Sequence, residues 1–214
     1  MPEKSLTKGE RTHQAIIESA YTLFLGQGYA ATSMRQIAER TGLALGGIYN
    51  HFASKEAIFA ELIIDRHPYQ QILPILLKTP TDDIETFVRT AAQAMISELG
   101  KRPDFIKLML IEMVEFNGRN MPNMLKHVLP QILPLIGKFN NKLLRSIPPF
   151  VFFRAFLGLF FSYYMTELLL ANTPAALMST NALDHFVEIF LHGVMVVPVP
   201  AGQSRFPDGA RDGK

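Results

Sequence analysis

Hydrogen-bonding side chains stand close together in residues 49–55. Tyr49, Asn50 and His51 are consecutive, and Lys55 follows four positions after His51. Phenol, amide and imidazole groups can bond base edges, and a lysine ammonium attracts a phosphate. Because the segment just before them holds the small residues Gly46 and Gly47, these side chains could approach a DNA groove. The elements that carry them decide whether they can reach it.

The preceding residues predict two short helices joined by a tight turn. Ser33 can cap a helix while Gln36 returns a hydrogen bond to the cap amide. Gly42 can take the left-handed conformation that ends this helix. Ile48 and Phe52 then supply an apolar pair that anchors a second helix, so that the polar side chains between them face outward. This spacing is typical of a helix-turn-helix.

A further helix is predicted to start at Lys55, capped by Ser54, where free amides and the ammonium could hold a phosphate. A buried helical hairpin without a partner is the alternative, but it does not explain the outward polar cluster. The predicted DNA-contacting residues are Thr32, Ser33, Arg35, Leu45, Gly46, Gly47, Tyr49, Asn50, His51 and Lys55.

This segment resembles the DNA-binding domain of TetR-family transcriptional regulators. The matching residues are Phe24, Gly28, Tyr29, Thr32, Ser33, Ile37, Ala38, Gly42, Gly46, Tyr49, His51, Phe52, Ser54, Lys55 and Glu56. Ala44 stands where the family usually has a capping serine, and Leu45 where it usually has a polar residue. The resemblance implies a homodimer that binds a palindromic double-stranded DNA operator and is released by a small-molecule effector.

The composition fits a cytoplasmic regulator. The chain has 214 residues, 48% of them hydrophobic, no cysteine and a formal net charge of +2. Without cysteine it has neither disulfides nor thiolate metal sites, and its polar N-terminus lacks the apolar core of a signal peptide. The small net charge adds little to the DNA-binding interpretation, which depends on where the charges lie.

Hydrophobic periodicity predicts an all-α fold with an N-terminal helix-turn-helix domain and a larger helical domain. The predicted domains are residues 8–67, with the DNA-binding helices and the linking helix four, and 68–197, with effector and dimerisation functions. Residues 198–214 have the composition of a disordered tail. The predicted helices are 10–25, a short pair within 34–52, 55–67, 82–99, 103–116, 122–144, 149–171 and 181–197.

The stretch 150–171 is apolar and long enough to span a bilayer. Arg154 and Glu167 argue against a span, because each would cost about 2.5 to 3.5 kcal/mol near the bilayer centre. A helix that is apolar all round can instead bury one side in its own domain and the other in a second subunit. The resemblance implies this arrangement, with a homodimer through residues 150–171 and 181–197 and no membrane partner.

Two rows of apolar and aromatic residues could line an effector site, and methionine and aromatic walls suit an apolar or aromatic ligand. Arg89, Glu112 and the tyrosine hydroxyls could anchor its polar groups; plain core packing is the alternative. The candidate ligand-binding residues are Arg89, Phe105, Met109, Glu112, Met113, Phe116, Phe153, Phe156, Phe160, Tyr163 and Tyr164.

No pattern favours an enzyme. The chain has no phosphate-cradling loop, no GxSxG elbow and no HExxH pair. Asp184, His185, Glu188 and His192 share part of one helix, but solvated or interface roles suit them better than a metal site. We therefore expect no catalytic residue, metal or cofactor. The remaining alternative is a helical membrane-associated or small-molecule-binding protein without a DNA-reading role.

Overall fold

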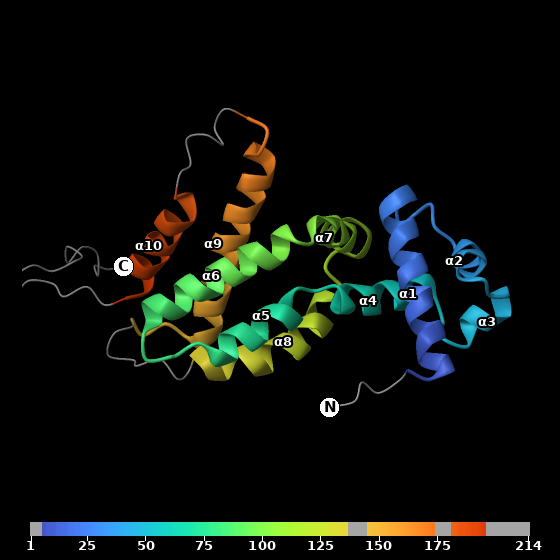
Figure 1. The fold of residues 1–214 in the computed structure, drawn as a ribbon, viewed down its shortest axis with the longest axis horizontal. Coiled ribbons are helices and arrows are strands. Elements are labelled where there is room, and N and C mark those ends of the chain that lie inside the picture. The colour runs from blue at the N-terminus through green and yellow to red at the C-terminus, as the bar shows by residue number, and fades with distance from the viewer. Residues whose placement is uncertain (1–5, 137–144, 174–180, 196–214) are drawn as a thin grey trace, which may run out of the picture. The chain divides into compact units, whose positions relative to one another are not determined.

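The computed structural model describes residues 6–136, 145–173 and 181–195, which form ten helices and no β-strand (Figure 1). The all-α prediction is confirmed. The helices are α1 Lys8–Gln27, α2 Met34–Thr41, α3 Leu45–Tyr49, α4 Lys55–Asp65, α5 Tyr69–Lys78, α6 Ile84–Gly100, α7 Pro103–Phe116, α8 Met121–Ile136, α9 Pro149–Leu170 and α10 Ala182–Val194.

The first helix starts earlier than predicted, because a capping box precedes it. The Thr7 hydroxyl accepts a hydrogen bond from the Glu10 amide at 3.2 Å. The Glu10 carboxylate accepts one from the Thr7 amide at 2.7 Å. Two helix-end amides are satisfied in this way. The Thr-x-x-Glu spacing is a readable signal for a start at Lys8.

The predicted helices leave out residues 69–78, where the structure has the helix α5. Pro74 lies inside α5. A proline lacks the amide proton that bonds the carbonyl four residues earlier, so it usually marks the end of a helix. The predicted helix 122–144 is seen as α8 up to Ile136. Residues 137–144 and the predicted tail 198–214 lie outside the described residues.

The chain forms two compact units, one of Met1–Ile75 with Ala94–Ile132 and the other of Leu76–Gln93 with Leu133–Lys214. Packing groups α7 with the N-terminal helices, and the domain boundary expected near Pro68 stays a prediction. The reason is that α7 packs on α1, and its Leu108 and Phe116 join the buried core of the N-terminal helices.

We call residues 8–65, from α1 to α4, the head. Its core takes fully buried side chains from each of its four helices, among them Ile16, Ile37, Ile48 and Phe59. Fully burying one such side chain stabilises the fold by about 1.5 to 3 kcal/mol. Because every helix contributes to one core, the head positions α3 rigidly on α1 and α4.

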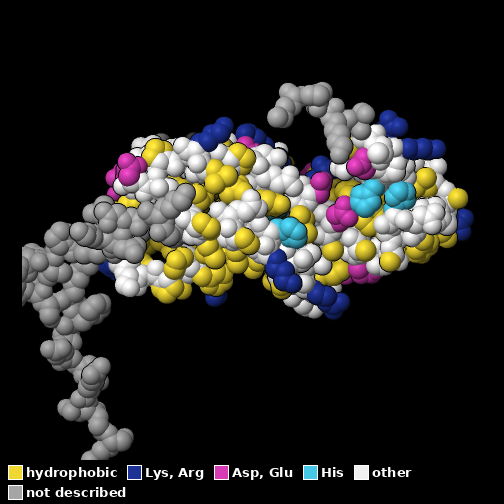
Figure 2. Space-filling view, turned by 90° about the horizontal axis from the view of Figure 1, so that it is seen from below, with side chains coloured by type: hydrophobic (Ala, Val, Ile, Leu, Met, Phe, Trp, Pro, Cys, Tyr) yellow, Lys and Arg dark blue, Asp and Glu magenta, His cyan; other side chains and the backbone are white. Residues whose placement is uncertain are grey.

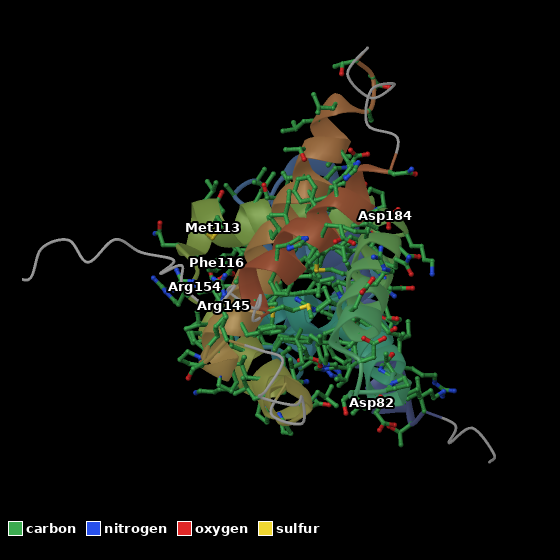
Figure 3. The ribbon with its side chains drawn as sticks, turned by 90° about the vertical axis from the view of Figure 1, so that its left-hand side faces the viewer. Asp82, Met113, Phe116, Arg145, Arg154 and Asp184 are labelled. Carbon is green, nitrogen blue, oxygen red and sulfur yellow. The ribbon has the colours of Figure 1, made fainter. Side chains whose placement is uncertain are left out.

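The second unit is built on an antiparallel pair, α9 and α10. Phe152 packs on Phe190 and Tyr163 on Phe186, with ring centroids 5.2 and 5.0 Å apart, so the pairing runs in opposite directions along the two helices. Arg89 of α6 bonds Asp184 of α10 at 2.7 Å, and Asp184 lies beside α6 in Figure 3. These contacts hold α6, α9 and α10 together.

Candidate nucleic-acid interface

The turn between α2 and α3 has the predicted caps. The Ser33 hydroxyl accepts from the Gln36 amide at 3.2 Å, and the Gln36 side chain accepts from the Ser33 amide at 2.8 Å. Gly42 ends α2 in the left-handed region, with φ 76° and ψ 26°. The amide of Leu43 bonds the carbonyl of Ala38 at 2.9 Å. This closure directs the chain sharply from α2 into α3.

The recognition helix α3 has one buried and one exposed side. Ile48 is fully buried on α3, and Phe52 is buried just after its end. Tyr49 and Leu45 expose 51% and 45% of their surface, and Asn50 is also exposed. The start of α3 at Ala44 has no side-chain cap, as the sequence indicated. The helix therefore presents a mixed apolar and polar face to solvent.

Thr32 and Ser33 act within the head. Thr32 is only 2% exposed, and its hydroxyl donates to the carbonyl of Gly28 at 2.8 Å. The Ser33 hydroxyl is engaged in the α2 cap. Arg35 is exposed and bonds Glu39 one turn later at 2.9 Å, an exposed pair that DNA could readily exchange for a phosphate. Of these three side chains, Arg35 is the one that is free to reach outward.

Lys55 has a second role that the sequence did not reveal. Its ammonium donates to the carbonyls of Tyr29 and Thr32 at 2.8 and 2.7 Å and lies 4.1 Å from the centre of the Tyr29 ring. The ammonium therefore ties the start of α4 to the loop before α2. Because a lysine has three protons to donate, one donor remains for a phosphate.

Tyr29 supports this lysine from the inside of the head. Its ring packs edge-on against Phe59, and its hydroxyl donates to Glu56 at 3.1 Å. Burial, and then the hydrogen bond to Glu56, raise the pKa of the Tyr29 phenol above its usual range. The sequence indicates Tyr29 only as a residue that matches the family, because a carbonyl acceptor leaves no signal in the residue type.

His51, a predicted DNA contact, belongs to a cluster behind α3. Its ring lies 6.0 Å from that of His13 of α1. Histidine side chains, drawn in cyan, are visible on this face of the molecule in Figure 2. His13 stacks on Phe52 with ring centroids 4.3 Å apart and bonds Glu61 of α4 at 2.6 Å. The cluster connects the end of α3 to α1 and α4.

The comparisons with known proteins agree with this geometry. The sequence profile of "Bacterial regulatory proteins, tetR family" matches residues 16–62, from the middle of α1 to α4. An uncharacterized HTH-type transcriptional regulator of Bacillus subtilis, YvkB, is 21% identical over 188 residues, covering 86% of this chain and 97% of its own. The chain belongs to the TetR family of regulators.

Two further relatives of this TetR-family chain show how far the likeness extends. The transcriptional repressor KstR2 of Rhodococcus jostii is 40% identical over 55 residues, which is 26% of each chain. A crystal structure of a TetR-family regulator from Mesorhizobium loti aligns with a TM-score of 0.67 and 22% identity, covering 89% of this chain and 100% of its own. The sequence likeness to KstR2 is local, whereas the fold likeness spans most of the chain.

The predicted effector-site residues of the TetR-family chain divide between the two compact units. In the first unit, Phe105 packs on His67 and Phe116 on Phe59, with ring centroids 5.1 and 4.8 Å apart. Met109 packs against the core of the head, while Met113 is exposed.

Glu112, also in the first unit, is fully buried, and its carboxylate accepts from the amide and the side chain of Asn120 at 2.6 and 2.7 Å. These two hydrogen bonds close the turn between α7 and α8. A direct role in binding a ligand stays a prediction for Glu112.

In the second unit the predicted residues lie mainly on α9. Phe153, Phe160, Tyr163 and Tyr164 are buried, and Phe156 is half-buried against Phe160 and Phe190. Burial raises the pKa of Tyr163 and of Tyr164.

Arg89 is held by three carboxylates, those of Glu85, Asp184 and Glu188, at 3.1, 2.7 and 3.3 Å. It therefore ties α6 to α10. A ligand anchor at Arg89 would have to displace one of these ion pairs, and its role toward an effector stays a prediction.

The helix α9 is the one described helix whose length and composition would allow it to cross a membrane, a test that core helices of soluble proteins also pass. No group of three or more metal-binding side chains occurs in the part of the chain that the structure describes. In the acidic and histidine group of α10, Asp184 and Glu188 bond Arg89, and His192 lies 3.8 Å from Glu188.

Proposed function

We propose that this chain is a ligand-responsive repressor that binds a palindromic DNA operator through α3. The observation that carries the proposal is that α3 has one buried side and one exposed side. Ile48 and Phe52 hold it in the core while Leu45, Tyr49 and Asn50 face solvent. A helix anchored on one side and exposed on the other can enter a major groove without disturbing the head.

Repression is supported by what the relatives are named. KstR2, which matches the head, is named a repressor. A bound repressor blocks transcription by occupying its operator, and release requires an effector that binds the DNA-free conformation more tightly than the DNA-bound one. Such a protein works where the chromosome is, so we place it in the cytoplasm and assign it no catalytic activity.

We also propose that two copies dimerise through α9 and α10. Both helices keep large apolar side chains exposed, with Leu169 at 72% and Ile189 at 61%. Figure 3 draws both helices with their side chains. On α9 the exposed row includes the small residues Ala155, Gly158 and Ser162, which let a second helix approach closely. A twin subunit would remove this apolar surface from water.

Insertion of α9 into a membrane is the alternative to dimerisation. A bilayer would also cover the exposed leucines of α9, but it would have to accommodate Arg154, which is exposed, and Glu167. A subunit interface can cover the apolar row and still leave these charges in contact with water, which the bilayer core does not allow. We therefore favour the dimer, and sedimentation with and without lipid vesicles separates the two.

For the effector we propose an apolar or aromatic small molecule that meets the aromatic residues of α9. Phe156 is half-buried among Phe160 and Phe190, so its ring could turn to admit a flat ligand. Native mass spectrometry of the purified protein would reveal a carried ligand. A ligand that releases DNA from the wild type but not from a Phe156→Ala variant would support this site.

The DNA-binding proposal is tested by selecting duplexes from a random library with the purified protein. We expect enrichment of a two-fold symmetric site whose half-sites lie about 10 bp apart or a multiple of that. Tyr49→Ala should weaken binding to the selected site much more than binding to a scrambled duplex, because Tyr49 is exposed on α3. Equal enrichment of all sequences would contradict the proposed reading role.

A further inference from the structure

The head has a hollow beside the turn that leads into α3. Its volume is about 210 Å³. Leu43, in its wall, directly precedes Ala44, where α3 starts. The N-terminal end of α1 and α3 lie at the same end of the head in Figure 1. The hollow is lined by Lys8, Arg11, Thr12, Ala15, Thr41 and Leu43.

The two cations of this hollow are free. Lys8 and Arg11 are exposed, and neither side chain forms an ion pair or hydrogen bond with the described part of the chain. Among the other cations of the head, Arg35 bonds Glu39 and Lys55 bonds two carbonyls, whereas Arg40 is exposed but does not line the hollow. Two unpaired cations at one hollow create a local positive potential that attracts an anion.

The remaining polar groups of the hollow are already occupied. The hydroxyl of Thr12 donates to the carbonyl of Lys8 at 3.0 Å, and that of Thr41 to the carbonyl of Ile37 at 2.7 Å. The carboxylate of Glu10 accepts from the Thr7 amide, so it is directed to the helix cap. An anion in the hollow would therefore be held by Lys8 and Arg11, with the threonines as walls.

We propose that this hollow binds a phosphate of the DNA backbone next to the bases that α3 reads. The inference rests on the proposed DNA-binding function and adds a contact outside the helix-turn-helix. A guanidinium can bond two phosphate oxygens at once, and a lysine adds a mobile charge. Such contacts carry no sequence information, but they fix the register and orientation of the protein on the duplex.

The position of the hollow favours DNA over an acidic protein surface. Whenever α3 lies in a groove, the flanking backbone carries one negative charge about every 1.7 Å along the duplex axis. The hollow starts at the residue before the α3 cap position, so a flanking phosphate is available to it in the bound state. An acidic protein would need a separate interface, whereas a flanking phosphate comes with the same duplex that α3 binds.

The test measures the salt dependence of DNA binding by the full-length protein. The probes are a duplex selected from a random library by the wild type and a scrambled duplex of the same length. Lys8→Gln and Arg11→Gln should each weaken binding to both duplexes alike. Each should also lower the slope of log affinity against log salt by about 0.9 per occupied head. Between 50 and 200 mM salt, each variant should then lose about threefold less affinity per head than the wild type.

Matched variants separate this contact from general charge and from folding. Lys126→Gln removes an exposed lysine of α8 outside the head and should leave the slope close to that of the wild type. Lys8→Arg keeps the positive charge, so it should retain the wild-type salt slope that Lys8→Gln loses. Thr12→Val keeps the shape of the hollow and should change DNA affinity little. Because neither cation has an internal partner, Lys8→Gln and Arg11→Gln should unfold at the wild-type urea midpoint.

The possible outcomes separate a failure of the phosphate assignment from a failure of the proposed DNA-binding function. If the wild type selects a duplex but both Gln variants keep its affinity and slope, the phosphate assignment is overturned and the DNA-binding function stands. If the wild type selects no duplex, the function itself fails. The last measurement is the binding of inorganic phosphate to the protein, titrated at constant ionic strength. Micromolar binding that is lost in Arg11→Gln while the DNA slope is unchanged would make the hollow a free-anion site and overturn the DNA assignment.

Discussion

Phe59 of α4 and Phe116 of α7 stack face to face, with ring centroids 4.8 Å apart and 14° between their planes. Tyr29 packs edge-on against Phe116 at 4.9 Å, so the three rings connect the head to α7. Through Lys55 the same tyrosine connects to the loop before α2. A displacement of α7 would therefore reach the DNA-reading helices through packed side chains, without a flexible linker between them.

The first prediction concerns this stack. Phe116→Ala should lower the free energy of unfolding by about 3 kcal/mol, because it removes a buried ring and leaves a cavity between α4 and α7. Val114→Ala on the same helix is the control; Val114 is 75% exposed, so its loss should change stability by less than about 0.5 kcal/mol. Urea denaturation followed by circular dichroism measures both. Equal effects would show that the stack contributes nothing specific.

A second prediction separates the two roles of Lys55. Lys55→Gln should lower the free energy of unfolding by about 1 to 2 kcal/mol as well as weaken DNA binding, because two carbonyls lose a charged donor. Arg35→Gln removes an exposed ion pair instead and should weaken DNA binding at nearly unchanged stability. If Lys55→Gln affected DNA binding alone, Lys55 would act purely as a phosphate ligand.

Much of the head could be predicted because its signals are local. The caps at Ser33 and Ser54 and the glycine at position 42 depend on residues within a few positions of one another, and all three occur as expected. Ile48 and Phe52 were predicted to be buried from periodicity alone, and both are. Local hydrogen bonding and a repeating apolar pattern are the properties that a single sequence displays directly.

The rest depends on contacts between distant residues. Lys55 bonds the carbonyl of Tyr29, 26 positions earlier, and a carbonyl acceptor is present in every residue. Glu112 bonds Asn120 because the turn after α7 brings this amide back to it, and no local pattern in the sequence indicates that contact. The helix α5 was missed because Pro74 interrupts the pattern, while its tertiary packing tolerates the missing hydrogen bond.

The third prediction tests the uncapped start of α3. Ala44→Ser restores a capping hydroxyl where none is bonded now, and it should stabilise the helix by about 1 kcal/mol. Hydrogen exchange of the amides of residues 46–49 should slow in the variant. Ala31→Ser, at an exposed position outside a helix, is the control and should leave these amides unchanged. Unchanged exchange in both variants would show that the start of α3 is already fully ordered.

A fourth prediction concerns pH. Burial, and then the charge of Arg102, lower the pKa of His67 from 6.5 to about 4. Its ring accepts a hydrogen bond from the Tyr69 amide at 3.0 Å, which requires an unprotonated nitrogen. Above pH 6.5 the imidazole is neutral in both the folded and the unfolded chain. As pH falls from 6.5 to about 4, the unfolded chain gains a proton that the folded chain does not, so stability is lost in this window.

The variant for this prediction is His67→Gln, whose amide oxygen can still accept from Tyr69 but does not titrate. The wild type should be the more stable protein at pH 7.5. The stability advantage of the wild type should shrink by about 2.5 kcal/mol by pH 4.5, because a tenfold difference in proton affinity between the folded and unfolded chains corresponds to about 1.4 kcal/mol. Urea unfolding of both proteins at several pH values gives the difference directly. A constant difference across this range would mean that His67 titrates alike in the folded and unfolded chains.

The last prediction tests the surface of the second unit. Ile189 is 61% exposed on α10, and Ile189→Glu should convert the dimer into a monomer, because a carboxylate would be buried without a partner at a subunit interface. Leu110→Glu, at a 55% exposed position on α7, is the matched control and should leave the dimer intact. Analytical ultracentrifugation at micromolar concentration measures both. The monomer should also bind the palindromic site far more weakly than the wild-type dimer does, since it loses the gain from simultaneous contact of two linked heads. A dimeric Ile189→Glu variant would place the subunit interface away from this face of α10.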